Sequence, residues 1–353
     1  MKKVSAKTYI PVILLAAVVI ALAVLTVYAM SLKNVSETAP DAISKVSDAE
    51  TGGRELRTAV PETPSPTHLP LSSADTLFAE DTAAEPAYPF WSEGSLFLGN
   101  VYRSPTLYVC VTVHNDPKLF GRPLVFYVAD IYVSDVTQIR TACESNDFQN
   151  AGRGWVKQMA NRENALVAIS GDYCGNRLGA VIIRNGEVYR AKINSYDICL
   201  LLRNGEMETM ASADTSISEI LDKDPWQAWE FGPYLIDSNG EPRKDYTGVR
   251  NKPQNPRTCI GYYEPGHYCF VVVDGRQAAS RGLSLVELAV LMHRLGCKQA
   301  FNLDGGGSAH FYWKDRILNS PSGGGRKISD IIYIAKESYN ESGFYCGKAG
   351  SSE

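Results

Sequence analysis

The sequence predicts an α+β fold, with helices packed on a mainly antiparallel sheet, as a single globular domain behind an N-terminal transmembrane helix. From residue 90 onward, short apolar runs alternate with turn signals, which is typical of strands joined by hairpins. Asn-Gly pairs at 185–186, 204–205 and 239–240 lie beside apolar stretches. Such pairs tolerate the positive φ of a tight hairpin, which favours antiparallel over parallel pairing.

The N-terminus predicts that the rest of the chain is exported. Three lysines (Lys2, Lys3 and Lys7) precede an uncharged apolar run at 9–30. This run is long enough for a membrane span, which needs about 20 residues, and the lysines should stay in the cytoplasm. A signal peptide cleaved before Met30 is the alternative. The run is longer than a usual signal-peptide core, which favours the anchor.

The chain is expected to divide into three regions. Residues 1–30 form a cytoplasmic stub and a transmembrane signal-anchor. Residues 31–89 are rich in Ser, Thr, Pro and Ala and bury little apolar area, so we expect a disordered linker that holds the domain off the membrane. Residues 90–353 form the globular domain.

Composition limits the class of protein. The chain has 353 residues, of which 44% are hydrophobic and 21% are charged, which excludes a wholly disordered chain and a multi-span membrane protein. The net charge of −4 argues against a nucleic-acid binder. Eight cysteines in an exported chain allow disulfides. Spacing assigns no pair, and buried free thiols are equally compatible with it.

Within the domain, runs rich in Val, Tyr and Phe predict strands at 107–113 and 124–133. One helix is expected at about 154–163. A second begins at Ser284, which forms a capping box with Glu287, and Gly296 suits the position after its end. The apolar stripe of this second helix comprises Leu285, Leu288, Ala289, Met292 and Leu295.

Chemistry-bearing residues follow strands in glycine-rich loops. In the first loop, Asp304 is followed by three glycines, Gly305, Gly306 and Gly307, and then by Ser308. Such a loop lets the backbone approach a ligand and can form a nest of N–H groups for an anion. Asp304 could act as acid, base or nucleophile. The alternative is a tight turn with a structural aspartate.

Other loops supply similar groups. Asp274 and Arg276 follow a buried strand, Gly171 and Asp172 follow another, and Arg257 with Thr258 precedes a third. A last loop at 319–326 contains Ser322 and a further arginine. Guanidinium groups bind phosphate, and paired carboxylates suit glycosidic bond cleavage. A β-turn with a surface ion pair is the alternative for Asp274 and Arg276.

Metal sites and common catalytic motifs give weaker signals. The chain has no H-E-x-x-H, P-loop or G-x-S-x-G motif and no histidine pair with metal-ligand spacing. The sequence requires no cofactor. A divalent cation bound by carboxylates is compatible with it, because oxygen ligands leave weak signatures. His310 follows the glycine loop and could reach the site or simply occupy a strand.

Taken together, these blocks resemble the phosphodiester glycosidase family. The resemblance rests on three blocks in the family's order: Asn302–Ser308, Pro256–Thr258 with Ile260-Gly261, and Val273–Arg276. Three shorter blocks are also similar, namely Ser170–Tyr173, Gly232-Pro233 and Pro321-Ser322. The resemblance covers about residues 124–334, and the family includes an enzyme that uncovers mannose phosphate by removing N-acetylglucosamine.

The resemblance implies hydrolysis of the bond between a sugar anomeric carbon and a phosphodiester oxygen. Its implied catalytic residues are Asp304, Asp274 and Asp172. Its implied substrate-binding residues are Arg257, Thr258, Arg276, Gly305, Gly306, Gly307, Ser308, Gly171 and Ser322. Two positions depart from the family pattern: Ser170 replaces an asparagine, and Ala309-His310 replaces a pair of small hydroxyl residues. Both departures could change the sugar that is accepted.

The predicted function is therefore an extracytoplasmic hydrolase of an N-acetylglucosamine-like sugar-1-phosphodiester in envelope or exopolysaccharide glycans. The expected partners are a sugar-phosphate or polysaccharide substrate and the membrane through residues 9–30, without nucleic acid. The main alternative is a non-catalytic, membrane-anchored module that binds glycans or sugar phosphates. A glycosyl-phosphate transferase is a third hypothesis. Acids in three separate loops favour an enzyme, because binding alone does not need them.

Overall fold

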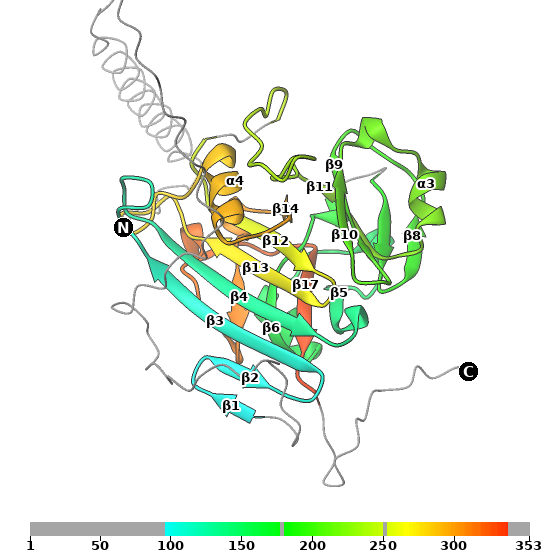
Figure 1. Ribbon diagram of the computed structural model, residues 1–353. Coiled ribbons are helices and arrows are strands. Elements are labelled where there is room, and N and C mark those ends of the chain that lie inside the picture. Colours follow the sequence, from blue (N-terminus) through cyan, green and yellow to red (C-terminus); the bar gives the residue numbers. More distant parts are fainter. Residues whose placement is uncertain (1–95, 177–179, 250–252, 338–353) are drawn as a thin grey trace, which may run out of the picture. The chain divides into compact units, whose positions relative to one another are not determined.

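The computed structural model describes residues 96–176, 180–249 and 253–337 (Figure 1). The predicted signal-anchor, the predicted linker and Cys346 lie outside these residues. All strand pairs of the three described sheets are antiparallel. The predicted α+β class with mainly antiparallel sheet is therefore confirmed.

Three sheets account for the described strands. The largest has the order β1-β2-β3-β4-β13-β12-β14, with β1 (Leu96–Leu98), β2 (Val101–Arg103), β3 (Leu107–Asn115), β4 (Val125–Val133), β13 (His267–Val273), β12 (Arg257–Glu264) and β14 (Gln299–Asn302). The second has the order β16-β15-β6-β17-β5, with β16 (Arg316–Ile317), β15 (Phe311–Trp313), β6 (Ala165–Ser170), β17 (Asp330–Ala335) and β5 (Ile139–Cys143). The third has the order β10-β9-β11-β7-β8, with β10 (Met207–Met210), β9 (Asp197–Leu202), β11 (Pro225–Phe231), β7 (Ile182–Arg184) and β8 (Glu187–Arg190).

Short helical segments connect these strands. The α-helices of the described residues are α2 (Val156–Arg162), α3 (Ile217–Asp222) and α4 (Leu285–Arg294). Single 3₁₀ turns occur at η2 (Val136–Gln138), η3 (Phe148–Asn150), η4 (Cys174–Asn176), η5 (Ser212–Asp214), η6 (Gly306–Ser308) and η7 (Ser322–Gly324). No helix of the described residues is long and apolar enough to cross a membrane.

Alternation along the strands explains how the sheets are layered. Successive side chains of a strand point to opposite faces, so a strand between two layers is apolar on both. In β13, Phe270 and Val272 join the core shared by the three sheets, whereas Val271 and Val273 pack toward α4. In β17, alternate residues face either that shared core or α2. The first and second sheets, which contain β13 and β17, therefore form a sandwich with α4 and α2 on its outer faces.

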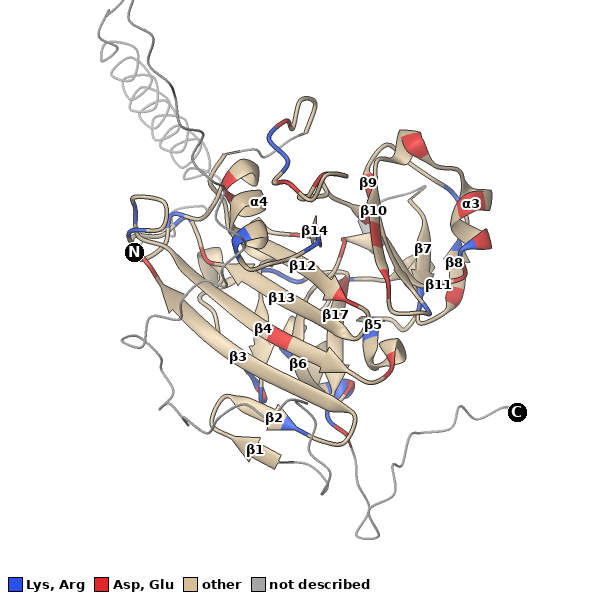
Figure 2. Cartoon of the chain, viewed as in Figure 1, with Lys and Arg blue, Asp and Glu red and all other residues tan. Residues whose placement is uncertain are grey.

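The distribution of charged residues agrees with this layered arrangement. Figure 2 shows β3 and β13 without any charged residue along their length, while acidic and basic residues gather in the loops and on α3. A strand buried on both faces has no room for an unpaired charge. Charges inside the domain are therefore exceptions that need partners.

The hairpins agree well with the sequence prediction. Asn185-Gly186 joins β7 to β8, and Asn204-Gly205 joins β9 to β10. The third pair, Asn239-Gly240, forms a turn closed by the isolated bridge between Ile236 and Pro242 rather than a strand hairpin. The seven described cysteines are free thiols, six of them buried.

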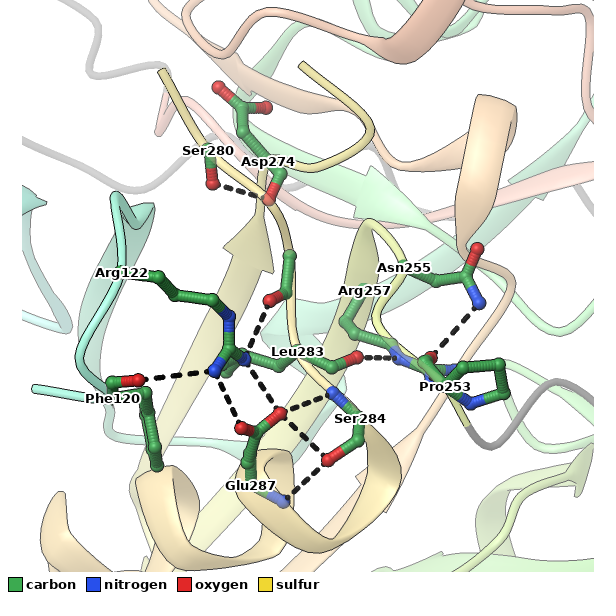
Figure 3. A network of polar contacts seen from close by, with 11 residues as sticks. Phe120, Arg122, Pro253, Asn255, Arg257, Asp274, Ser280, Leu283, Ser284 and Glu287 are labelled. Carbon is green, nitrogen blue, oxygen red and sulfur yellow. Dashed lines mark hydrogen bonds and ion pairs between the residues drawn. The ribbon is translucent and has the colours of Figure 1, made fainter. Parts of the chain in front are cut away.

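Helix α4 begins and ends where its sequence predicts. Ser284 and Glu287 form the reciprocal capping box, and Gly296 adopts a φ of +86° after the helix. The same Glu287 carboxylate accepts two hydrogen bonds of 2.7 Å from Arg122, so the cap also attaches the helix to the 116–124 loop (Figure 3). Arg122 further donates to the carbonyl oxygens of Phe120 and Gly282.

Replacing the cap should measure its contribution to stability. We expect Ser284→Ala to lower the free energy of unfolding by about 1 kcal/mol, because the Glu287 N–H loses its partner at the helix start. Urea denaturation of the full chain checks this value. Ser195→Ala, at an exposed serine outside any helix, is the matched control, and equal losses in the two variants would contradict the prediction.

Candidate functional site

Loops that follow three strands meet at one end of the sandwich. The Asp304 N–H donates to the Gly171 carbonyl oxygen at 3.0 Å, which joins the loop after β14 to the loop after β6. The Gly306 N–H donates to Pro256 O at 2.9 Å, and the Arg326 N–H donates to Gly307 O at 3.0 Å. The predicted loops around residues 171, 256, 304 and 322 are therefore brought together by backbone hydrogen bonds.

A carboxylate, a hydroxyl and a guanidinium form the centre of this cluster. Arg326 Nη2 lies 3.2 Å from Asp304 Oδ1, and Arg326 Nε donates to Ser308 Oγ at 2.6 Å. The Asp304 side chain is 11% exposed, whereas that of Arg326 is 52% exposed. We call Asp304, Ser308 and Arg326 the arginine–carboxylate site. Its guanidinium can meet a ligand from solvent while the carboxylate stays below it.

The three glycines have different reasons to lack a side chain. A Cβ on Gly305 would lie 2.6 Å from Pro256 O, and a Cβ on Gly306 would lie 3.2 Å from Arg276 Nη2. Gly305 and Gly306 therefore leave room for other atoms of the protein. A Cβ on Gly307 would make only ordinary contact with Arg326, at 3.7 Å. The sequence predicted that these glycines let the backbone approach a ligand, and two of the three make room for neighbouring protein atoms.

Arg276 and Tyr173 form the rim of the site. Arg276 adopts a φ of +61°, and its Nε and Nη2 donate to Asn255 Oδ1 at 3.0 and 2.8 Å. This contact holds the exposed guanidinium beside Gly306. The Tyr173 ring centroid lies 5.9 Å from Arg326 Cζ, and its hydroxyl accepts a hydrogen bond from Arg153 Nη2 at 2.9 Å. Two arginines thus border adjacent glycines of one loop.

Asp172 points into the fold rather than toward this rim. Its Oδ2 accepts from Arg184 Nη2 at 2.8 Å, and both side chains are almost fully buried. Asp330 lies beside this pair and accepts from the N–H groups of Asp172 and Tyr173 at 3.4 and 3.2 Å. A Cβ on Gly171 would collide with the Asp330 carboxylate. The loop after β6 is therefore positioned by a buried charge cluster.

The same cluster is a candidate for binding a metal. Ligand atoms of Asp172, Cys174 and Asp330 all lie within 4.8 Å of one another. Arg184 already supplies a positive charge to Asp172, and burial raises the pKa of the Cys174 thiol well above its ordinary value. Within the described residues, Asp172 Oδ1 is buried without a hydrogen-bond partner, and burial raises the pKa of Asp330, which favours a proton in this cluster. The donor set suits a proton and a guanidinium better than a divalent cation.

The Asp274 side chain also makes its hydrogen bonds inside the fold. Its carboxylate accepts from Asn319 Nδ2 at 2.9 Å and from the Ser320 N–H at 3.1 Å. Burial raises the pKa of Asp274 above its ordinary value. These contacts hold the start of the loop that delivers Arg326. Ser322 lies in η7 of that loop, and its carbonyl oxygen faces Gly307.

The described contacts of Arg257 and Thr258 are internal as well. Arg257 Nε donates to Leu283 O at 2.9 Å, and its Nη2 donates to Pro253 O at 2.8 Å (Figure 3). Burial lowers the pKa of Arg257 to about 10. Among the described residues, the buried Thr258 hydroxyl has no hydrogen-bond partner. Their predicted roles in substrate binding stay predictions.

Three residues of the site were not among those singled out from the sequence. Arg326 was noted only as a further arginine in its loop. Arg184 is a charged residue inside an apolar strand, and such a residue needs a buried acid. Asp330, the first residue of β17, is likewise a charged residue in an apolar strand. Only the tertiary structure shows that these charges meet.

The comparisons with known proteins agree with the resemblance seen in the sequence. Residues 163–335 match the family described as phosphodiester glycosidase (NAGPA). The chain is 27% identical over 199 residues to the SPbeta prophage-derived uncharacterized protein YomE of Bacillus subtilis strain 168, a match that covers 54% of this chain and 31% of that protein. The chain thus spans about a third of the length of this curated relative.

A solved structure shares the fold. The catalytic domain of zebrafish N-acetylglucosamine-1-phosphodiester alpha-N-acetylglucosaminidase, auto-inhibited by its pro-peptide, matches with a TM-score of 0.55 and 22% identity. The match covers 69% of this chain and 87% of that domain. At this level of identity the comparison shows a common architecture.

The buried acid pair predicts a pH-dependent stability. Burial and the Asp172 carboxylate raise the pKa of Asp330 to about 7, against about 3.9 in an unfolded chain. Between these values the folded protein keeps a proton that the unfolded chain releases, so Asp330 lowers stability as the pH rises. Asp330→Asn imitates the protonated acid. Relative to the native chain, its free energy of unfolding should therefore increase by at least about 1 kcal/mol between about pH 5 and pH 8.

Urea denaturation of both chains across this range is the measurement. Asp214→Asn, at an exposed aspartate of η5, is the control and should keep a constant difference from the native chain. A constant difference for Asp330→Asn as well would show that Asp330 is ionised throughout the range.

Proposed function

Because residues 163–335 place this chain in the phosphodiester glycosidase family, we propose that it hydrolyses the bond between a sugar anomeric carbon and a phosphodiester oxygen. The proposed sugar is N-acetylglucosamine or a close relative in envelope or exopolysaccharide glycans, outside the cytoplasm. The arginine–carboxylate site is the observation that carries the proposal. It joins a carboxylate, a hydroxyl and an exposed guanidinium in one loop cluster.

The two arginines of the cluster suit the phosphate. Guanidinium groups bind phosphate oxygens in bidentate fashion, and both Arg276 and Arg326 are exposed beside adjacent glycines. Asp304 suits the sugar. Its carboxylate could attack the anomeric carbon or take a proton from the attacking water. Arg326, which contacts both the carboxylate and solvent, would hold the phosphate next to Asp304.

The leaving group explains why one carboxylate at the site suffices. Most glycosidases use a second carboxylic acid to protonate the departing oxygen. Here the departing group is a phosphate monoester, which leaves as a stabilised anion and can be held by arginine. Asp172 and Asp274 are occupied by internal hydrogen bonds, which is compatible with catalysis by Asp304 together with two guanidinium groups.

The first test is release of reducing sugar from an N-acetylglucosamine-1-phosphodiester by the full chain. We expect Asp304→Asn to lower kcat by about 10²- to 10⁴-fold, because the amide can neither attack nor accept a proton. Asp214→Asn, with its exposed side chain, should retain native activity. Equal activity of the Asp304→Asn and native chains would remove Asp304 from the mechanism.

A second test concerns the phosphate. Arg326→Lys keeps the charge but loses the planar fork and the Nε hydrogen bond to Ser308. Its kcat/KM for the same phosphodiester should fall by about 10- to 100-fold. Arg316→Lys, at an exposed arginine of β16, is the control. Steady-state kinetics of both variants that match the native chain would argue against phosphate binding by Arg326.

These assays also separate the alternatives. Saturable binding of the phosphodiester without turnover would favour the non-catalytic binding module. Formation of a new glycoside when an acceptor alcohol is added would favour the transferase. The Asp304 carboxylate and the arginines gathered around one glycine loop favour the hydrolase, because a binding module needs no carboxylate beside an anion.

A further inference from the structure

A separate cavity of about 290 Å³ lies beside the arginine–carboxylate site. It is lined by Trp155, Val156, Lys157, His310, Ile317, Asn319, Pro321 and Gly324. None of these residues belongs to the arginine–carboxylate site. The volume is at the small end of the range for ligand pockets, about 300 Å³, so it suits one small ring.

One lining residue, His310, is itself buried but brings a ring nitrogen without a hydrogen bond within the described residues. His310 is 3% exposed, and its Nδ1 is 2.7 Å from Ser308 O, so Nδ1 carries the proton and donates it. Nε2 then presents a lone pair. Nε2 has no hydrogen bond within the described residues, and a Cβ on Gly325 would collide with it. Gly325 therefore packs closely against the ring, and any larger residue at this position would cover Nε2.

The charge state of the ring is also set by its surroundings. Burial, and then the nearby Arg326, lower the pKa of His310 from its ordinary value. The imidazole is therefore neutral at neutral pH, and Nε2 accepts a hydrogen bond rather than donating one. A hydroxyl group is the natural donor for such an atom.

The remaining walls suit a sugar ring. Trp155 precedes α2 and keeps 40% of its surface exposed, although large aromatic residues are usually well buried. Ile317 and Pro321 add apolar surface. A pyranose has an apolar C–H face that packs on an aromatic ring and hydroxyl groups around its edge. An exposed indole with one fixed acceptor fits both features.

We infer that this cavity is a subsite for an uncharged pyranose ring, which packs on Trp155 and donates a hydroxyl hydrogen bond to His310 Nε2. Ser308 connects the subsite to the proposed reaction, because its carbonyl oxygen binds His310 and its hydroxyl binds Arg326. The ring is a sugar other than the one whose bond is cleaved. Resting on the proposed function, the inference makes the substrate an oligosaccharide phosphodiester rather than a single sugar unit.

Two substitutions at His310 distinguish the roles of its two ring nitrogens. His310→Asn places its amide N–H₂ near the position of Nδ1 and can keep the hydrogen bond to Ser308 O, but it has no acceptor at Nε2. His310→Gln reaches the position of Nε2 and can present an acceptor there. Trp155→Ala tests the stacking surface at a partly exposed position.

The experiment is calorimetric titration of the full chain with the methyl α-glycosides of glucose, galactose, mannose and N-acetylglucosamine. At least one should bind, with affinity reduced about 10-fold or more in His310→Asn and Trp155→Ala and largely retained in His310→Gln. Asp214→Asn, at an exposed aspartate outside both sites, should bind the same glycoside as tightly as the native chain does. This arm is independent of turnover, so failure of hydrolysis leaves the subsite standing.

Two results would overturn the inference. In one, none of the four glycosides binds the native chain. In the other, binding survives unchanged in both His310→Asn and Trp155→Ala. If the His310 variants fold poorly, glycoside binding by Trp155→Ala and by the native chain can still be compared, and that comparison decides the question.

Discussion

The candidate site depends on one buried charge, the guanidinium of Arg184. This side chain is fully buried, and its Nη1 donates to Ile183 O and Ala228 O in the third sheet while its Nη2 binds Asp172 in the loop after β6. An unpaired buried cation would cost several kcal/mol, so the Asp172 carboxylate must face inward toward Arg184. Asp330 lies beside Asp172, and its oxygens accept the N–H groups of Asp172 and Tyr173 in the 171–173 loop. Gly171 O, in the same loop, receives the N–H of Asp304.

Local sequence signals predicted much of the fold. The capping box at Ser284 fixes α4, and the Asn-Gly pairs at 185–186 and 204–205 fix two hairpins, because each depends on neighbours a few residues apart. The sequence analysis did not predict how the sheets and helices are layered. Strands such as β13 are apolar on both faces, and only the packed structure shows that one face meets α4 and the other the shared core.

The candidate site was predicted as a set of residues, with Asp304 as the first choice for the catalytic carboxylate and Asp274 or Asp172 as its partner. The sequence places all three in similar loops after strands, so it does not show which of them face inward. Packing separates them. Arg184 draws Asp172 inward and Asn319 holds Asp274, which leaves Asp304 beside an exposed arginine. These partners lie 12 to 45 residues from the acids they bind, and no spacing rule connects them.

The two departures from the family pattern meet at a single atom. Ser170 Oγ and His310 Nδ1 both donate to Ser308 O, and the His310 N–H reaches Ser170 Oγ at 3.3 Å. A serine at 170 is shorter than asparagine, and the imidazole supplies the second donor to this carbonyl. The departures therefore act as one coupled change. Because the other side of Ser308 binds Arg326, a change of sugar subsite at His310 can leave the arginine–carboxylate site intact. The proposed sugar subsite and the proposed site of bond cleavage thus lie on opposite sides of one residue.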